Sequence, residues 1–480
     1  TAYISKMLQF INFPADYANS AAERILELET KLAIPRLDKV QSRDIRNFNN
    51  PKKLNELDKL TPAFDWIKFL LDMGIDSLPE EVIVMQPNYM IALNEFLEST
   101  SIEDLKILMK WSTLDNSARY LSTEIEKTNW EFYSKTLSGA KKQRDAEQRA
   151  LGTVSRSVGE AIGRLYVEAK FPPEAKQNAE KMISNVIKAF QIRIEKLDWM
   201  GEETKSRAIE KLDKFTVKIA YPDEWEDYSK LKVEEKNNFA ENMLAVSKWN
   251  RDNNLSEIGK PVDKSEWGMP PQTVNAYFNP LNNEIVFPAA ILQPPFYNFT
   301  ADDAVNYGGI GAVIGHEISH AFDDSGARFD GDGNVNNWWT EKDLKEFEKR
   351  GKALADQYSK IEVLDDVFIN GEFTLGENIG DLGGVLGAYD GLQLHFENTG
   401  RPSDIDGFTA EQRFFISWAT VWRTLTREDA LRTQIKTDPH SPGIYRATQP
   451  LKNVDAFYEA FDIKLGDEMY LAPEDRVRIW

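Results

Sequence analysis

Two histidines flank a glutamate in the segment Val313-Ile-Gly-His-Glu-Ile-Ser-His320, whose residues favour a helix. Residues four apart lie about 40° apart around a helix and one turn along it, so both imidazoles can reach one tetrahedral zinc ion. Glu317 follows the first histidine and can reach water at that ion, where a general base is needed. A chance match on an ordinary helix is the alternative, and the scarcity of histidine, four in 480 residues, counts against it. The motif predicts a hydrolytic zinc site.

A pair of carboxylates farther along the chain can complete this site, which needs a third protein ligand and an open position for water. Glu377 and Asp381 are also four apart and share a helix face within a glycine-rich segment. One of the two could bind the metal while the other holds a ligand imidazole, with a solvated carboxylate pair as the alternative. Asp323 lies three residues after His320 and could orient that second imidazole, although a surface carboxylate at a helix end is an equal alternative.

Two further segments have residues suited to a bound peptide. His440 and Arg446 lie in a turn-rich loop, where an imidazole and a guanidinium can stabilise the oxyanion of peptide hydrolysis. Asn275 and Ala276 lie on a predicted strand that could pair with an extended peptide, with an ordinary edge strand as the alternative. The remaining histidine, His395, lies near the end of a predicted helix and is interpreted as structural.

Composition limits the partners and the kinds of metal site. Lys and Arg number 58 against 78 Asp and Glu, and the resulting charge of −20 makes nucleic acid and anionic membranes poor candidate partners. The chain has no cysteine, so a metal must use histidine, carboxylate, carbonyl or water. No apolar stretch approaches the roughly 20 residues that span a bilayer. We predict a cytoplasmic location, with export or display at the surface of a bacterium left open, and the sequence predicts no oligomeric state.

The apolar pattern predicts a mainly helical chain with two domains, 1–240 and 241–480. Helical spacing continues to about residue 235, with helix boundaries predicted at Ser101, at Pro172 and at Pro222. The turn-rich segment 237–271 is interpreted as the connection.

The second domain carries all the candidate site residues. It opens with two β-like runs, 274–278 and 284–287, which suggest a hairpin. Helices are expected at about 302–324, 341–358, 375–396, 410–425 and 455–461. The predicted fold class is therefore mainly α with a small β-sheet.

With these residues in place, the chain resembles the neprilysin family of zinc endopeptidases, and most closely its cysteine-free bacterial oligopeptidases. The resemblance rests on ordered segments that include Val274-Asn-Ala-Tyr, Ile285-Val-Phe-Pro-Ala-Ala-Ile-Leu-Gln-Pro-Pro-Phe, Asn306-Tyr-Gly-Gly-Ile-Gly, the motif at His316, Gly376-Glu-Asn-Ile, His440-Ser-Pro-Gly and the terminal Trp480. It implies a two-domain zincin, in which a thermolysin-like catalytic domain is enclosed by a helical capping domain. The chain is expected to begin inside the helical half of the family pattern, without an N-terminal portion.

The resemblance also implies a role for each candidate residue. One zinc ion per chain is held by His316, His320 and Glu377, and water is activated by Glu317. Support for the ligands comes from Asp323 and Asp381, and oxyanion stabilisation from His440 and Arg446. The peptide backbone is held by Asn275 and Ala276, and an apolar pocket for the residue after the scissile bond is formed with Val421 and Trp422.

The predicted function is zinc-dependent hydrolysis of internal bonds in small to medium-sized peptides, before bulky apolar residues. A noncatalytic peptide-binding or adhesion protein of the same fold is the alternative from another class. Retention of Glu317 and all three ligands counts against it. A metal-dependent exopeptidase has similar ligands and stays open.

Overall fold

The computed structural model describes residues 1–480, which divide into two compact units. The first unit contains Thr1–Thr153 and Asp227–Asp263, and the second contains Val154–Glu226 and Lys264–Trp480. This division differs from the single boundary predicted near residue 240. Residues 154–226 belong with the C-terminal residues because α10 (Pro173–Lys196) packs on α16 (Leu375–Thr399), and β3 (Thr216–Ala220) pairs with β5 (Glu284–Pro288).

The first unit consists of helices and one two-stranded antiparallel sheet. Its elements are α1 (Ala2–Phe10), α2 (Ala15–Ala33), β1 (Pro51–Lys53), α3 (Leu57–Leu60), α4 (Trp66–Asp72), β2 (Glu81–Ile83), α5 (Pro87–Ser99), α6 (Ile102–Ser117), α7 (Thr123–Trp130), α8 (Ala146–Ser157), whose end is assigned to the second unit, and α12 (Phe239–Ser256). Helix α12 occupies much of the segment that was predicted to be a connection. A capping box in which Asn238 and Glu241 bond each other's backbone N–H groups starts this helix, and its Asn-x-x-Glu pattern was overlooked in the sequence.

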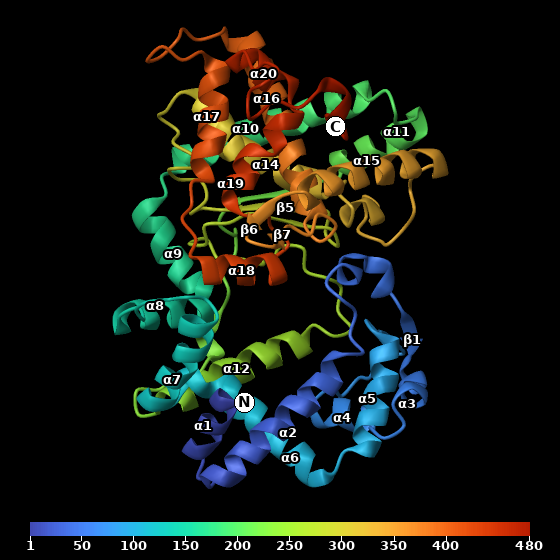
Figure 1. Cartoon of the computed structure of the whole chain (residues 1–480), viewed down its shortest axis with the longest axis vertical. Coiled ribbons are helices and arrows are strands. Elements are labelled where there is room, and N and C mark those ends of the chain that lie inside the picture. The colour runs from blue at the N-terminus through green and yellow to red at the C-terminus, as the bar shows by residue number, and fades with distance from the viewer. The chain divides into compact units, whose positions relative to one another are not determined.

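The second unit is also mainly helical, which confirms the predicted fold class (Figure 1). Besides α10, β3, β5 and α16, its elements are α9 (Gly159–Lys170), α11 (Glu202–Asp213), β4 (Tyr277–Asn279), α13 (Asp303–Asn306), α14 (Ala312–His320), α15 (Glu341–Ser359), β6 (Glu362–Leu364), β7 (Val367–Phe368), α17 (Ala410–Val421), α18 (Glu428–Thr437), α19 (Gly443–Thr448) and α20 (Asp455–Phe461). None of the helices in the structure combines the length and apolar composition that crossing a bilayer requires.

A three-stranded sheet of order β3-β5-β4 lies in the second unit. The predicted hairpin is confirmed, since β4 and β5 pair antiparallel, but β4 begins only at Tyr277. The parallel neighbour β3 was not predicted. Helical spacing predicts the end of a helix before Pro222, whereas these residues form a strand whose pairing with β5 is set by residues about 70 positions away.

Helices α14 and α16 form the most extensive contact between elements of the second unit. A Cβ atom added at Gly315 would lie 2.7 Å from the carbonyl oxygen of Gly384, and one added at Gly384 would lie 2.5 Å from that of Ala312. Glycine is therefore required at this crossing, where the two backbones touch. The contact brings the histidine motif on α14 against the glutamate on α16.

Replacement of Gly315 by alanine is expected to lower the free energy of unfolding by about 1–3 kcal/mol, because the new methyl group meets backbone that cannot rotate away. Urea denaturation measures this change. Gly351→Ala on α15 is the matched control, since its Cβ would make only an ordinary 3.5 Å contact with Leu375. An equal loss in both variants, or none in either, would contradict the role given to this crossing.

Candidate metal centre

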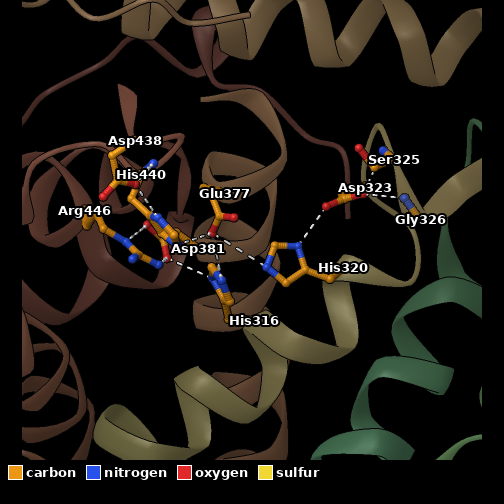
Figure 2. A network of polar contacts seen from close by, with 10 residues as sticks. All are labelled: His316, His320, Asp323, Ser325, Gly326, Glu377, Asp381, Asp438, His440 and Arg446. Carbon is orange, nitrogen blue, oxygen red and sulfur yellow. Dashed lines mark hydrogen bonds and ion pairs between the residues drawn. The ribbon is translucent and has the colours of Figure 1, made fainter. Parts of the chain in front are cut away.

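Three potential metal ligands converge where α14 meets α16 (Figure 2). The Nε2 atoms of His316 and His320 lie 3.3 and 3.6 Å from Oε2 of Glu377. The two imidazole rings are nearly perpendicular, at 85°, with centroids 4.5 Å apart. One ligand atom from each of the three residues falls within 4.8 Å of the others, so the group can hold a single metal ion.

The chemistry of this group fits zinc. Two imidazoles and one carboxylate form a three-ligand set that leaves a fourth tetrahedral position open. Oε2 of Glu377 is buried and accepts no hydrogen bond, although imidazole nitrogens surround it. A buried carboxylate oxygen without a hydrogen-bond donor is costly, and a cation among these side chains removes that cost.

Each histidine of the motif also faces a second carboxylate. Nδ1 of His320 lies 2.7 Å from Oδ2 of Asp323, and Nδ1 of His316 lies 3.0 Å from Oδ1 of Asp381. A carboxylate at Nδ1 favours the tautomer in which Nε2 carries no proton and can bind metal. The sequence prediction placed Asp323 and Asp381 beside the ligand imidazoles, and the structure brings them there.

Arg446 forms an ion pair that the sequence analysis did not anticipate. Its Nε and Nη2 donate hydrogen bonds of 2.9 and 2.7 Å to the two carboxylate oxygens of Asp381. Its guanidinium carbon also lies 3.8 Å from the ring centroid of Trp422. Burial acts to raise the pKa of Asp381, but Arg446 and His316 outweigh that effect and hold the pKa below its usual value.

His440 reaches the same group from the loop before α19. Its Nε2 lies 3.1 Å from Oε2 of Glu377, and its Nδ1 donates a 2.7 Å hydrogen bond to Asp438. The loop is tied to α16 because Ser441 donates a 2.8 Å hydrogen bond to Asn378, the residue after Glu377. Asp438 and Ser441 were both missed. Their closeness to His440 in the sequence was the available signal.

The carboxyl groups of Glu317 and Glu377 have opposite environments. Burial raises the pKa of Glu317, and its Oε2 is buried without a hydrogen-bond partner. Burial acts in the same direction on Glu377, but His320, His316 and His440 outweigh it and hold the pKa of this carboxyl well below its ordinary value. Glu377 therefore stays ionised as a ligand, while Glu317 has the raised pKa that suits a proton acceptor and donor.

A cavity of about 410 Å³ opens onto these residues. Asn275, Ala276 and Trp422 line it, together with His440 and the motif side chains, whereas Val421 and Asp381 do not. The apolar part of the wall also includes side chains that the sequence analysis did not select: Met269, Ile291, Phe296, Val313 and Trp418. Two of these could have been found from helical spacing, since Val313 precedes His316 by three residues and Trp418 precedes Trp422 by four.

The chain is similar to known proteins over most of its length. Two family models, both described as Peptidase family M13, match residues 1–222 and 275–477. Neutral endopeptidase of Lactobacillus helveticus is 33% identical over 99% of this chain and 71% of its own length. Human neprilysin is 33% identical over 100% of this chain and 68% of its own length.

A solved structure is similar over the whole chain. The Mycobacterium tuberculosis zinc metalloprotease Zmp1, in complex with an inhibitor, is 42% identical, with a TM-score of 0.95 over 100% of this chain and 73% of that one. The fold and the His-His-Glu group thus define a zinc metallopeptidase of the zincin type. The chain belongs to peptidase family M13, the family of neprilysin and the bacterial neutral endopeptidases, which confirms the resemblance and the enzyme class inferred from sequence. It spans between 56% and 71% of the length of the curated relatives compared.

Proposed function

We propose that this chain hydrolyses internal bonds of small to medium-sized peptides at one zinc ion held by His316, His320 and Glu377. The observation that carries the proposal is the convergence of these three ligand atoms within 4.8 Å at the wall of a cavity. Glu317 lies between His316 and His320 on α14 and lines the same cavity, and its Oε2 has no hydrogen-bond partner. Ligands, base and space for a substrate therefore occur together.

The residues of the site divide the work of hydrolysis. When bound, zinc supplies Lewis-acid polarisation of the scissile carbonyl and activates water. Glu317 takes a proton from the attacking water and delivers it to the leaving amine. His440 donates a hydrogen bond to the developing oxyanion, aided by the positive charge of Arg446, whose Nη1 is not part of the ion pair with Asp381. Asp323 and Asp381 orient the two ligand imidazoles.

Peptide binding follows from the strand order and from the wall of the cavity. Strand β4 is an edge strand, and Asn275 and Ala276 line the cavity immediately before it. We propose that these two residues bond the backbone of an extended substrate. The apolar wall at Trp422 and Trp418 favours a bulky apolar side chain after the scissile bond. Val421 is buried and does not line the cavity, so it is not assigned to this wall.

The charges on this wall favour an endopeptidase over an exopeptidase. Arg446 is the one lysine or arginine that lines the cavity, and its guanidinium is already paired with Asp381. An exopeptidase needs a charged group for a free terminus, and the lining beyond the catalytic residues offers none. The noncatalytic alternative is not favoured, because Glu317 and every ligand are present.

Removal of zinc is expected to abolish cleavage reversibly. The test measures zinc content by elemental analysis and cleavage of an internally quenched peptide before and after chelation and zinc restoration. About one zinc ion per chain, with cleavage lost on chelation and regained with zinc, is the expected result. Cleavage that survives complete zinc removal, or a zinc-loaded chain that cleaves no peptide, would contradict the proposal.

A further inference from the structure

Lys211 is a buried lysine that the proposed mechanism does not use. It lies on α11 and is only 1% exposed. Its Nζ donates hydrogen bonds of 2.7, 2.9 and 2.7 Å to the carbonyl oxygens of Ala321, Gly326 and Phe329. All three partners are acceptors, so the site uses the three N–H groups that only the ammonium form offers.

These carbonyl groups belong to residues 321–329, here named the 321–329 loop, which follows α14 directly. Ala321 is the C-cap of α14, so its carbonyl group has no partner within the helix. A cation is favoured at such a helix end. A Cβ at Gly326 would lie 1.7 Å from the carbonyl oxygen of His320, so the loop folds back tightly onto the last turn of α14. Lys211 therefore joins the start, middle and end of this loop at one point.

Asp323 connects the loop to the metal centre. Its Oδ2 lies 2.7 Å from Nδ1 of His320 (Figure 2). Its Oδ1 accepts hydrogen bonds of 2.8 and 2.6 Å from the backbone N–H groups of Ser325 and Gly326. Because those N–H groups are part of the loop, the position of the Asp323 carboxylate depends on how the loop is held.

The surroundings of Lys211 act on its charge in both directions. Its Nζ lies 5.6–5.9 Å from the ring centroids of Phe278, Phe322 and Trp338. Burial lowers the pKa of Lys211 to about 7, and the carboxylates of Asp323 and Asp330 act against that shift.

The loop also has supports that do not involve Lys211. The indole N–H groups of Trp338 and Trp339 donate to the carbonyl oxygens of Phe329 and Ala327. These two bonds do not depend on Lys211. We therefore expect a Lys211 variant to fold, with the loop held less firmly.

We propose that Lys211 is a positioning residue for the metal centre, which holds the 321–329 loop and thereby fixes Asp323 against the His320 imidazole. The inference rests on the proposed ligation of zinc by His320. Residues that hydrogen-bond a metal ligand, as Asp323 does with His320, typically change metal affinity by about 10–100-fold when they are replaced.

The test compares zinc affinity, by competition with a chelator of known affinity, in Lys211→Met and in Lys218→Met. Lys218 is a matched control because it is also buried, at 9% exposure, but pairs with Glu284 in the sheet. Lys211→Met is expected to bind zinc about 10–100-fold more weakly. Lys218→Met is expected to unfold at a lower temperature while its zinc affinity stays within about twofold of the wild type, since its site is independent.

A double variant tests the route through Asp323. If Lys211 acts through this carboxylate, Lys211→Met combined with Asp323→Asn loses no more zinc affinity than Asp323→Asn alone. Additive losses would overturn that route. Unchanged affinity in Lys211→Met, or the same loss in Lys218→Met, would overturn the inference as a whole.

Two further comparisons keep the result interpretable. If Lys211→Met does not fold, Lys211→Gln takes its place, because glutamine retains two N–H donors. Weaker zinc binding in this variant is then the expected result, and unchanged zinc affinity would overturn the inference. Wild-type protein that binds no zinc would count against the proposed function itself. A Lys211→Met protein that binds zinc as tightly as a zinc-binding wild type would count against the role of Lys211 alone.

Discussion

Glu317→Gln is expected to keep zinc bound while kcat falls by about 10²–10⁴-fold, the usual contribution of a general acid–base residue. Glutamine has nearly the same shape as glutamate but cannot accept a proton at neutral pH. The three proposed ligands are untouched, and the buried oxygen of Glu317 has no hydrogen-bond partner whose loss would disturb the fold. The measurements are kcat with a quenched peptide and zinc content by elemental analysis.

The matched control for this prediction is Glu372→Gln, the same substitution at an exposed residue near the start of α16. Its kcat is expected to equal that of the wild type. A zinc-loaded Glu317→Gln protein that retains wild-type turnover would remove Glu317 from the proposed mechanism. Loss of zinc in this variant would instead assign Glu317 a role in holding the metal.

The sequence predicted the parts of the site that depend on local spacing. His316, Glu317 and His320 follow from the four-residue repeat of one helix, and Glu377 with Asp381 from the same repeat on another. Helix periodicity places side chains on a common face, so such pairs are visible without any knowledge of the fold. The bounds of α15 and α20 were predicted to within a residue for the same reason.

Apart from the contact between Asp438 and His440 and the capping box at Asn238, the missed contacts join residues far apart in the chain. Arg446 pairs with an aspartate 65 positions earlier, and Lys211 bonds carbonyl groups more than 100 positions later. Strand β3 is recognisable only through its partner β5, because five residues of mixed polarity carry little signal of their own. Such pairings are set by how α10, α14 and α16 pack, which no local pattern in the sequence specifies.

His316→Ala is expected to lose zinc and, with it, all cleavage. The substitution removes one of three ligand atoms, so zinc affinity should fall by more than the roughly 10–100-fold that loss of a residue supporting a ligand costs. The matched control is His395→Ala, because His395 pairs with Asp303 and is not part of the metal-binding group.

Thermal unfolding with and without zinc separates metal loss from misfolding in this variant. A ligand at 100 times its dissociation constant stabilises the folded state by about 2.7 kcal/mol, so zinc should raise the unfolding temperature of the wild type and of His395→Ala. His316→Ala should unfold at the same temperature with and without zinc, because the remaining side chains of His320 and Glu377 bind the ion too weakly. A normal zinc-dependent rise in His316→Ala would show that His316 is not a ligand, and the metal would then have to be held by the remaining carboxylates and imidazoles around Glu377.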